Sequence, residues 1–257
     1  MRNPKSILLI LVLFSCRSVM AYSDGFGPYR EGEEPPAFPY QIMEDVSPEH
    51  KGEEPIVNQF KSKDGFVIHC GQLEATTQDS EFEITLNGPD GKVLDHFSDS
   101  SFPFWGLTAI EGDFNQDKKS DFAVYLGNGG NGLAAERGTW VFFLSSEKGY
   151  SAVELGTDSI GINDLVQLGK DGCLRIIHTA LIDAPEGVKV PPMTELYFRL
   201  YRLLKVSGST IVEDKTSEPR FPKIVASPKW AEQQNHKETK LLTPKQKKEM
   251  IKNSKIF

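Results

Sequence analysis

The chain has 257 residues, of which 39% are hydrophobic and 25% charged, and its formal net charge is −7. An acidic protein repels the phosphate backbone of nucleic acids, so this charge argues against general nucleic-acid binding. The length is ample for one domain with a sizeable hydrophobic core and flanking segments.

Residues 1–21 have the three parts of a secretory signal peptide. Two basic residues precede an apolar run at 7–14, which is too short to span a bilayer, and Val19 and Ala21 suit cleavage. We therefore expect export to the periplasm, the outer membrane or the extracellular space. Removal of this segment deletes three basic residues and no acidic ones, so the mature net charge becomes −7 − 3 = −10.

The same region supports a second interpretation. Residues 13–16, Leu-Phe-Ser-Cys, resemble a bacterial lipobox, in which the cysteine is lipidated and becomes the mature N-terminus. Phe14 fits poorly at the position two before Cys16. We favour ordinary cleavage and a soluble exported protein. The alternative is a lipoprotein attached to a membrane through Cys16.

A Pro/Glu-rich segment, residues 22–56, follows the signal peptide. It contains six prolines among many acidic residues and few apolar ones. Such a segment buries too little apolar surface to offset the entropy cost of ordering it. We expect an extended or disordered linker that spaces the folded domain from a membrane or a neighbour.

Residues 57–222 are predicted to form the folded domain. Short apolar or alternating runs recur there between turn residues, without a long amphipathic helix. The predicted strands fall into three groups: 66–73, 81–86 and 92–97; 107–111, 121–126, 139–145 and 150–155; and 164–168, 173–182, 195–206 and 210–214. A helix over 195–206 is the one local alternative. The spacing predicts an all-β antiparallel meander of about three four-stranded sheets.

The most informative part of the chain is a short acidic loop. Oxygen-bearing side chains occupy its positions one, three, five and nine: Asp113, Asn115, Asp117 and Asp121. At position seven the backbone carbonyl of Lys119 offers one more oxygen. Alternate donors in a tight loop converge on one hard cation, and carboxylate and carbonyl oxygens suit calcium. The spacing therefore predicts a Ca²⁺ site.

This stretch, Gly112 to Val124, resembles the FG-GAP/VCBS-type repeat, whose consensus runs Gly-Asp-x-Asn-x-Asp-Gly-x-x-Asp-hydrophobic. The resemblance covers residues 107–150. In that family the repeats build four-stranded propeller blades and the aspartate loop binds calcium, so it implies blade-like sheets and the five metal ligands named above. A propeller needs four to eight blades, and this chain has room for about three. We therefore expect a partial, propeller-like meander whose open edges are covered by the linker, a C-terminal helix or a second copy of the chain.

The loop also departs from the family pattern. Lys118 replaces the glycine at position six, where φ > 0 is favoured, and this costs about 1 kcal/mol. Position twelve, where an EF-hand has a bidentate glutamate, is Val124, so water or Glu111 has to complete the metal shell. We expect weak binding, with a Kd of about 10⁻⁴–10⁻³ M. The alternative is a metal-free turn that only supports the fold.

A degenerate second copy of the loop lies further along the chain. Gln167 and Gly169 occupy positions one and three, and Arg175 occupies position nine, so only Asp171 and Gly172 match the pattern. We predict that this loop binds no metal. Arg175 cannot ligate a cation, but it can pair with a neighbouring carboxylate.

Other candidate sites are weaker. Cys70 and Cys173 would form either one disulfide or two separate buried thiols. The glycine-rich stretch 127–132 matches a dinucleotide fingerprint, but the following residues are too few for the phosphate-binding helix, which favours a loop between strands. The five histidines lack metal-ligand spacing, and His69 and His178 are expected in the core. No serine-nucleophile signature is present.

The C-terminal tail, residues 223–257, is basic, with eight lysines from position 229 onward. Thr243-Pro244 is a good helix start, since threonine caps the helix and proline suits its first position.

Our leading hypothesis is an exported, non-enzymatic, calcium-binding β module for recognition or adhesion at the cell envelope, with a polysaccharide or a protein as partner. The alternatives are an envelope polysaccharide hydrolase or lyase and a lipid-anchored scaffold protein. The hydrolase would use acidic residues without a recognisable pairing: Asp95, Asp99, Asp164 and Asp183.

Overall fold

The structure is a computed structural model. It describes residue 29 and the ranges 35–48, 57–73, 81–100, 104–128, 138–158, 164–183, 197–226 and 242–254. The predicted signal peptide, Cys16 and most of the predicted glycine-rich loop therefore lie outside the described residues.

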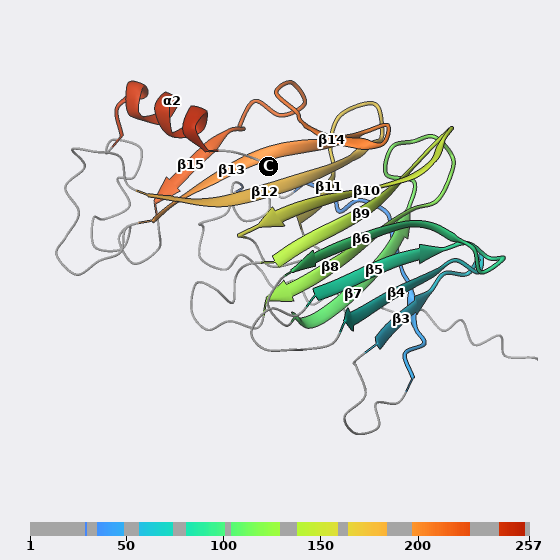
Figure 1. Ribbon diagram of the computed structural model, residues 1–257. Coiled ribbons are helices and arrows are strands. Elements are labelled where there is room, and N and C mark those ends of the chain that lie inside the picture. Colours follow the sequence, from blue (N-terminus) through green and yellow to red (C-terminus); the bar gives the residue numbers. More distant parts are fainter. Residues whose placement is uncertain are drawn as a thin grey trace, which may run out of the picture.

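Three five-stranded antiparallel sheets make up the fold. The N-terminal sheet contains β2 (Glu44–Asp45), β3 (Val57–Lys61), β4 (Val67–Leu73), β5 (Glu81–Asn87) and β6 (Val93–Ser100). The central sheet contains β1 (Gln41–Ile42), β7 (Phe104–Gly112), β8 (Asp121–Asn128), β9 (Gly138–Ser146) and β10 (Gly149–Thr157). The C-terminal sheet contains β11 (Leu165–Gln167), β12 (Leu174–Asp183), β13 (Tyr197–Ser207), β14 (Thr210–Glu213) and β15 (Lys223–Ala226). Figure 1 shows these groups following one another in chain order.

The central sheet lies between the other two and is buried on both faces. Four consecutive residues of β9, 141–144, are fully buried, because alternate side chains of a strand point to opposite faces. Val141 and Phe143 pack with the N-terminal sheet, against Ile68 and Ile84 among others. Phe142 and Leu144 pack with the C-terminal sheet. Two hydrophobic interfaces thus hold the three layers together.

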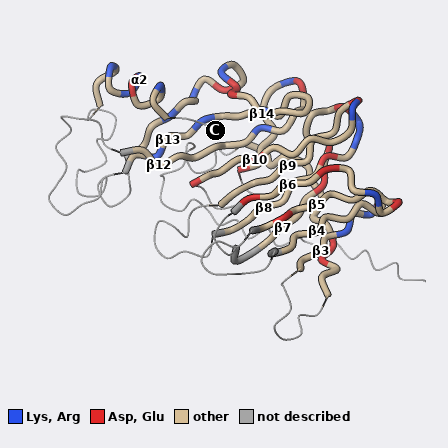
Figure 2. The backbone as a smooth tube through the Cα atoms, in the orientation of Figure 1, with Lys and Arg blue, Asp and Glu red and all other residues tan. Residues whose placement is uncertain are grey.

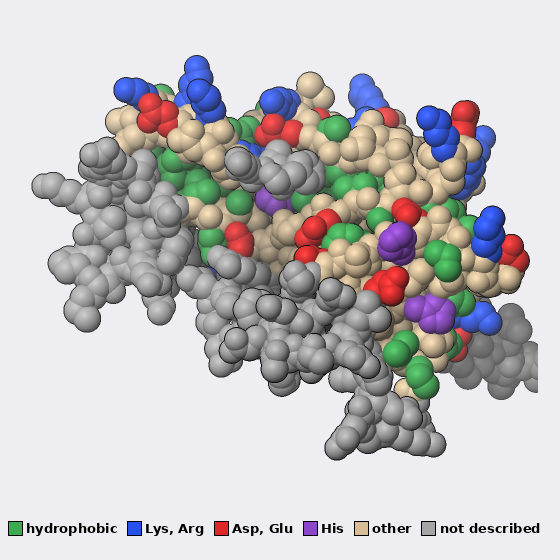
Figure 3. Space-filling view, viewed as in Figure 1, with side chains coloured by type: hydrophobic (Ala, Val, Ile, Leu, Met, Phe, Trp, Pro, Cys, Tyr) green, Lys and Arg blue, Asp and Glu red, His purple; other side chains and the backbone are tan. Residues whose placement is uncertain are grey.

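The outer face of the C-terminal sheet has a smaller apolar cluster and the helix α2 (Pro244–Asn253). Thr243 is the N-cap of this helix and forms a capping box with Gln246. Met250 is buried, and Arg202 of β13 donates hydrogen bonds to the carbonyl of Ile251 at 2.5 Å and to that of Ser254 at 2.8 Å. Basic residues line the outward side of α2 in Figures 2 and 3. Of the described helices, none is long and apolar enough to cross a membrane.

Residues 35–48, which we call the strap, run along the first full strand of each sheet. Ala37 forms a β-bridge with Val166 of β11, β1 pairs with β7, and β2 pairs with β3. Phe38 and Met43 are buried. The strap lies within the predicted linker, but this part of it is built into the domain and covers the same edge of all three sheets.

Most sequence-based expectations for the fold are confirmed. The described residues form antiparallel sheets and a short C-terminal helix, and the three predicted groups of strands lie in the three sheets. Each sheet has five strands and not the predicted four, because the strap and β15 add strands at the edges. Residues 197–207 form the strand β13, not a helix. The sheets do not close into a ring. Four strands were not predicted: β1, β2, β3 and β15.

The two described cysteines decide one open alternative. Cys70 and Cys173 are both buried and both free, so they are separate thiols. Cys70 lies in the interface between the N-terminal and central sheets, where burial raises the pKa of its thiol to about 12. His178 is also buried, and its Nε2 is 2.9 Å from the carbonyl oxygen of Gly156.

Candidate metal centre

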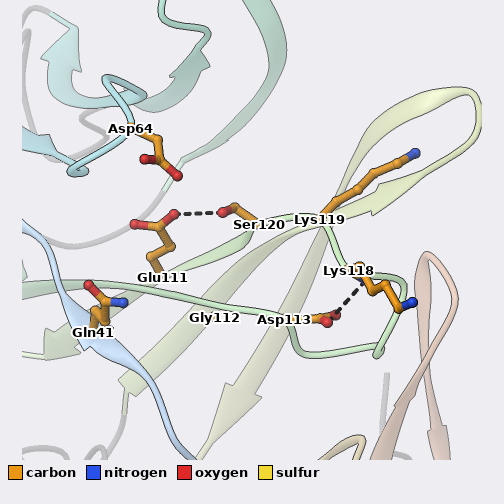
Figure 4. Close-up of a pocket in the computed structure, with 8 residues that line it drawn as sticks. All are labelled: Gln41, Asp64, Glu111, Gly112, Asp113, Lys118, Lys119 and Ser120. Carbon is orange, nitrogen blue, oxygen red and sulfur yellow. Dashed lines mark hydrogen bonds between the residues drawn. The ribbon is translucent and has the colours of Figure 1, made fainter.

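The predicted calcium loop joins β7 to β8 at one end of the central sheet (Figure 4). Two of its residues adopt left-handed backbone conformations: Gln116 has φ = 64° and Lys118 has φ = 70°. The expectation of a positive φ at position six is therefore confirmed. A lysine there retains the conformation at a cost of about 1–2 kcal/mol, because its Cβ crowds the carbonyl.

Side chains at positions one, three and five each fold back onto a backbone N–H of the loop. Oδ2 of Asp113 accepts from Lys118 at 3.0 Å, and Oδ1 of Asn115 accepts from Asp117 at 3.0 Å. In the same way, Oδ1 of Asp117 accepts from Lys119 at 2.9 Å. These bonds order the loop without using all of its side-chain oxygens.

The other oxygen of Asp113 has no partner. Oδ1 is buried, yet no described donor lies within hydrogen-bond distance of it. A buried carboxylate oxygen without a donor is costly, and most such atoms in proteins are paired. A bound cation is one way to satisfy it, so the site fits a group with positive charge.

Asp121 at position nine has a different environment. It is fully buried, and its two oxygens accept four hydrogen bonds: from the backbone N–H groups of Phe114, Asn115 and Ser145 and from the Ser145 hydroxyl. Desolvation raises the pKa of Asp121 to about 6, although these hydrogen bonds lower it. Protein donors thus fill the usual acceptor sites of this carboxylate, and it fastens the loop to β9.

Ser145 connects two of the predicted ligands. Its hydroxyl oxygen lies 2.7 Å from Oδ1 of Asp121 and 3.0 Å from Oδ2 of Asp117. A hydroxyl group has a single hydrogen, so it cannot donate to both carboxylates at once. Because Asp117 is exposed, solvent can supply donors to it when the Ser145 hydroxyl donates to Asp121.

A pocket of about 330 Å³ opens next to the loop (Figure 4). Three carboxylates from three elements line it: Asp64 from the β3–β4 turn, Glu111 from the end of β7, and Asp113. Glu111 accepts a hydrogen bond from the Ser120 hydroxyl at 2.6 Å. None of the three acids forms an ion pair with another described residue. The pocket is therefore acidic.

Two lysines also line the pocket without neutralising it. The ammonium group of Lys119 donates a hydrogen bond to the carbonyl of Ser146 at 2.9 Å. In Figure 4 the side chains of Lys118 and Lys119 both extend away from Asp64 and Glu111. The three carboxylates outnumber the two lysines, so the pocket lining has a formal charge of −3 + 2 = −1.

The five predicted ligands belong to one loop, but their carboxylates do not form a ready-made cage. Within the described ranges, no three Asp, Glu, His or Cys side chains are placed to hold a metal ion. A site at this loop would also need the amide oxygen of Asn115, the carbonyl of Lys119 and water.

The degenerate loop has an arginine where the first loop has Asp121. The Arg175 guanidinium is buried and donates to Asp171 at 2.7 Å and to Asp214 at 2.7 Å. The predicted pairing of Arg175 with a carboxylate is therefore confirmed. Hydrogen bonds from Arg175 hold the pKa of Asp171 well below its usual range. Desolvation alone would raise the pKa of Asp214, but hydrogen bonds from Ser217, Thr216 and Arg175 lower it.

The carboxylates considered for catalysis do not meet at the pocket. Asp95 accepts a hydrogen bond from the backbone of Ala152 at 2.7 Å, and Asp164 is buried. Neither they nor Asp99 line the pocket. The side chain of Asp183 lies outside the described set.

The sequence-based reasoning did not identify Asp64 or Gln41 as part of the site. A local signal existed for Asp64, because Asp64-Gly65 forms a turn between β3 and β4 with φ = 88° at the glycine. For Gln41 there was none, since it reaches the pocket only through the pairing of β1 with β7.

No protein-family model, no curated protein and no solved structure matches this chain.

Proposed function

We propose that this protein is an exported, non-enzymatic, calcium-binding β module of the FG-GAP/VCBS type. It would act in recognition or adhesion at the cell envelope, with a polysaccharide or a protein as its partner. The buried, unpartnered Oδ1 of Asp113 is the main support, because it lies in a loop with calcium-ligand spacing. The three stacked antiparallel sheets agree with blades of an open, propeller-like array.

The loop residues would share two tasks. Asp113, Asn115, Asp117 and the carbonyl of Lys119 would supply oxygen to the ion. Asp121 is the fifth predicted ligand, and its assignment as a direct ligand remains a prediction, since protein donors fill its oxygens in this structure. A bound Ca²⁺ would supply positive charge that offsets the acidic loop and stiffens this end of the central sheet.

Glu111 would complete the shell from the pocket side. Its carboxylate lines the same pocket as Asp113, and Glu111 lies near the end of β7, just before the loop. The hydrogen bond from Ser120 uses one of its oxygens and leaves acceptor capacity on the other. Water would fill the remaining positions, as is usual for six to eight oxygen ligands around Ca²⁺.

Calorimetric titration and thermal unfolding of the mature protein test the proposal. Calcium in the millimolar range should raise the Tm, and Asp117→Ala should abolish the rise. Asp90→Ala is a matched control, because exposed Asp90 accepts from the N–H of Lys92 at 3.1 Å just as Asp117 accepts from that of Lys119. An equal response in Asp117→Ala and the wild type would refute the ligand assignment.

A glycan array and an envelope-protein pull-down, each with calcium and with a chelator, test the recognition role. Binding that a chelator removes would support it. Binding that is unchanged by chelation would separate partner recognition from the calcium loop.

One observation favours a second candidate, an envelope polysaccharide hydrolase or lyase. Asp64 and Glu111 come from neighbouring sheets and line one pocket, as a pair of catalytic carboxylates does in glycosidases. Incubation with envelope polysaccharides should then release products that Glu111→Gln abolishes. An absence of products from the wild-type protein would dismiss this candidate.

A further inference from the structure

The strap and the calcium loop are in direct contact. The ring of Phe38 in the strap packs edge-on against that of Phe114 in the loop, with centroids 5.8 Å apart and an interplanar angle of 69°. Phe114 lies between Asp113 and Asn115 in the chain and is fully buried. Any change in the loop that moves these two donors must therefore act on Phe114 and on its contact with the strap.

Glycine at position 112 makes this contact possible. A Cβ there would come within 2.7 Å of the Phe114 ring and 3.5 Å of the Phe38 ring. The two aromatic rings thus occupy the space beside the backbone just before Asp113. The loop side of this packing is fixed as well, because the N–H of Phe114 donates to Asp121 at 2.7 Å.

A second contact connects the strap to the pocket. Gln41 pairs with Glu111 and lines the pocket together with Asp113. Gln41 thus forms part of the pocket wall, opposite carboxylates that no described basic residue neutralises. Strap docking thus places the Gln41 side chain beside the acidic side chains of this pocket.

From these contacts we infer that the strap is a calcium-sensitive latch: an ion in the loop tightens the docking of residues 35–48 across the three sheets. This inference rests on the proposed calcium site. An ion bound by Asp113 and Asn115 would restrain the residue between them, so Phe114 would stay against Phe38. Because binding and docking favour the same arrangement, each strengthens the other by linkage.

Docking matters because the strap covers strand edges. Its backbone bonds include Phe38 N–H to Leu165 at 3.0 Å, Met43 N–H to Ala109 at 3.0 Å and Val46 N–H to Gln59 at 2.8 Å. One segment therefore contributes hydrogen bonds to three separate sheets. Release of the latch would bare the edges of β11, β7 and β3, which is where another strand can pair.

Hydrogen exchange of the mature protein, followed by mass spectrometry, tests the latch. With calcium, the amides of residues 35–48 should exchange roughly five-fold more slowly, or more, than in chelator, in line with a typical coupling between two sites. Amides of β5 serve as the internal reference, since β5 forms its ladders with β4 and β6 and not with the strap. They should change much less.

A pair of variants isolates the aromatic contact. Phe114→Leu preserves the metal donors but loses the ring packing on Phe38, so calorimetry should still detect calcium while the extra protection of the strap disappears. Phe143→Leu is the control, because Phe143 is equally buried but belongs to the opposite interface. It should retain the protection. Phe38→Leu probes the same contact from the strap side if Phe114→Leu does not fold.

The outcomes separate the two proposals. Calcium binding by calorimetry without slower exchange in the strap would overturn the latch and leave the proposed function standing. Equal slowing in the strap and in β5 would also overturn it, since that is general stabilisation. An absence of calcium binding would overturn the proposed function and the latch together.

Discussion

The corresponding loops of the central and C-terminal sheets differ in how their acidic side chains are paired. In the loop before β8, acidic side chains face a buried Asp121, and one oxygen of Asp113 has no partner. In the loop before β12, Arg175 takes the place of that aspartate and pairs with Asp171 and Asp214. The second loop thus contains its own positive charge, whereas the first is the loop for which we propose an external cation.

The loops before β8 and β12 lie side by side and contact each other. The carbonyl of Phe114 accepts from the N–H of Leu174 at 2.8 Å, and Gln116 lies over Gly172. The difference in charge therefore comes from the residues of the loops themselves. Arg175 supplies its positive charge under all conditions, whereas the proposed calcium site would make the stability of the first loop depend on the calcium concentration.

The largest expected effect on stability comes from removing the positive charge of Arg175. Arg175→Met should lower the free energy of unfolding by about 3 kcal/mol, because Asp214 stays buried without its charged partner. Urea denaturation measures the loss. The control is Lys215→Met, whose exposed ion pair with Glu213 at 3.2 Å should be worth less than about 0.5 kcal/mol. Similar losses in both variants would contradict the assigned role of Arg175.

The second-largest loss of stability should come from changing Asp121, which anchors the first loop to β9. Asp121→Asn should cost about 2 kcal/mol in the presence of chelator, since an amide cannot accept all four hydrogen bonds that the carboxylate receives. The more exposed Asp117→Asn should cost less than about 0.5 kcal/mol under these conditions, because Asn also forms the turn. Equal costs would mean that Asp121 is not the anchor.

The two loops should respond to pH in opposite ways. Asp171 and Asp214 have lowered pKa values, so the stability they give is complete above about pH 4 and is lost as the pH falls further. The pKa of Asp121 is raised to about 6, so the folded state binds its proton first and stability rises as the pH falls from about 6 to 4.

Denaturation curves in chelator at several pH values between 7 and 3 test this contrast. Arg175→Met should flatten the wild-type slope below pH 4, and Asp121→Asn should flatten the slope between pH 6 and 4. A wild-type protein that loses stability steadily from pH 6 downward would contradict the role of Asp121.

The smallest expected effects concern position six, where both loops have a positive φ. Lys118→Gly should stabilise the protein by about 1 kcal/mol, because glycine adopts φ = 70° without crowding. Gly172→Ala should destabilise it by about 1 kcal/mol or more, since a Cβ there would lie 3.0 Å from Gln116. Thermal unfolding in chelator measures both. Changes of the same sign would show that backbone strain does not decide the outcome.

Sequence patterns were sufficient for most features that depend on neighbours along the chain. Strand alternation located eleven strands and their three groups, and the residue types of the Thr243 cap located α2. The left-handed residue at position six also followed from the loop pattern. These features are local, because side-chain period, turn chemistry and capping act over a few residues.

Only the tertiary structure decided which distant residues meet. The strap was expected to be a linker, because its composition is poor in apolar residues. Instead its backbone pairs with strands of all three sheets, and Phe38 and Met43 are buried in the two hydrophobic interfaces. Asp121 meets Ser145 only because β8 begins beside the end of the antiparallel strand β9. The sequence alone determined the elements and the chemistry of each loop, whereas the fold determined their partners, because edge pairing and burial depend on contacts far apart in the chain.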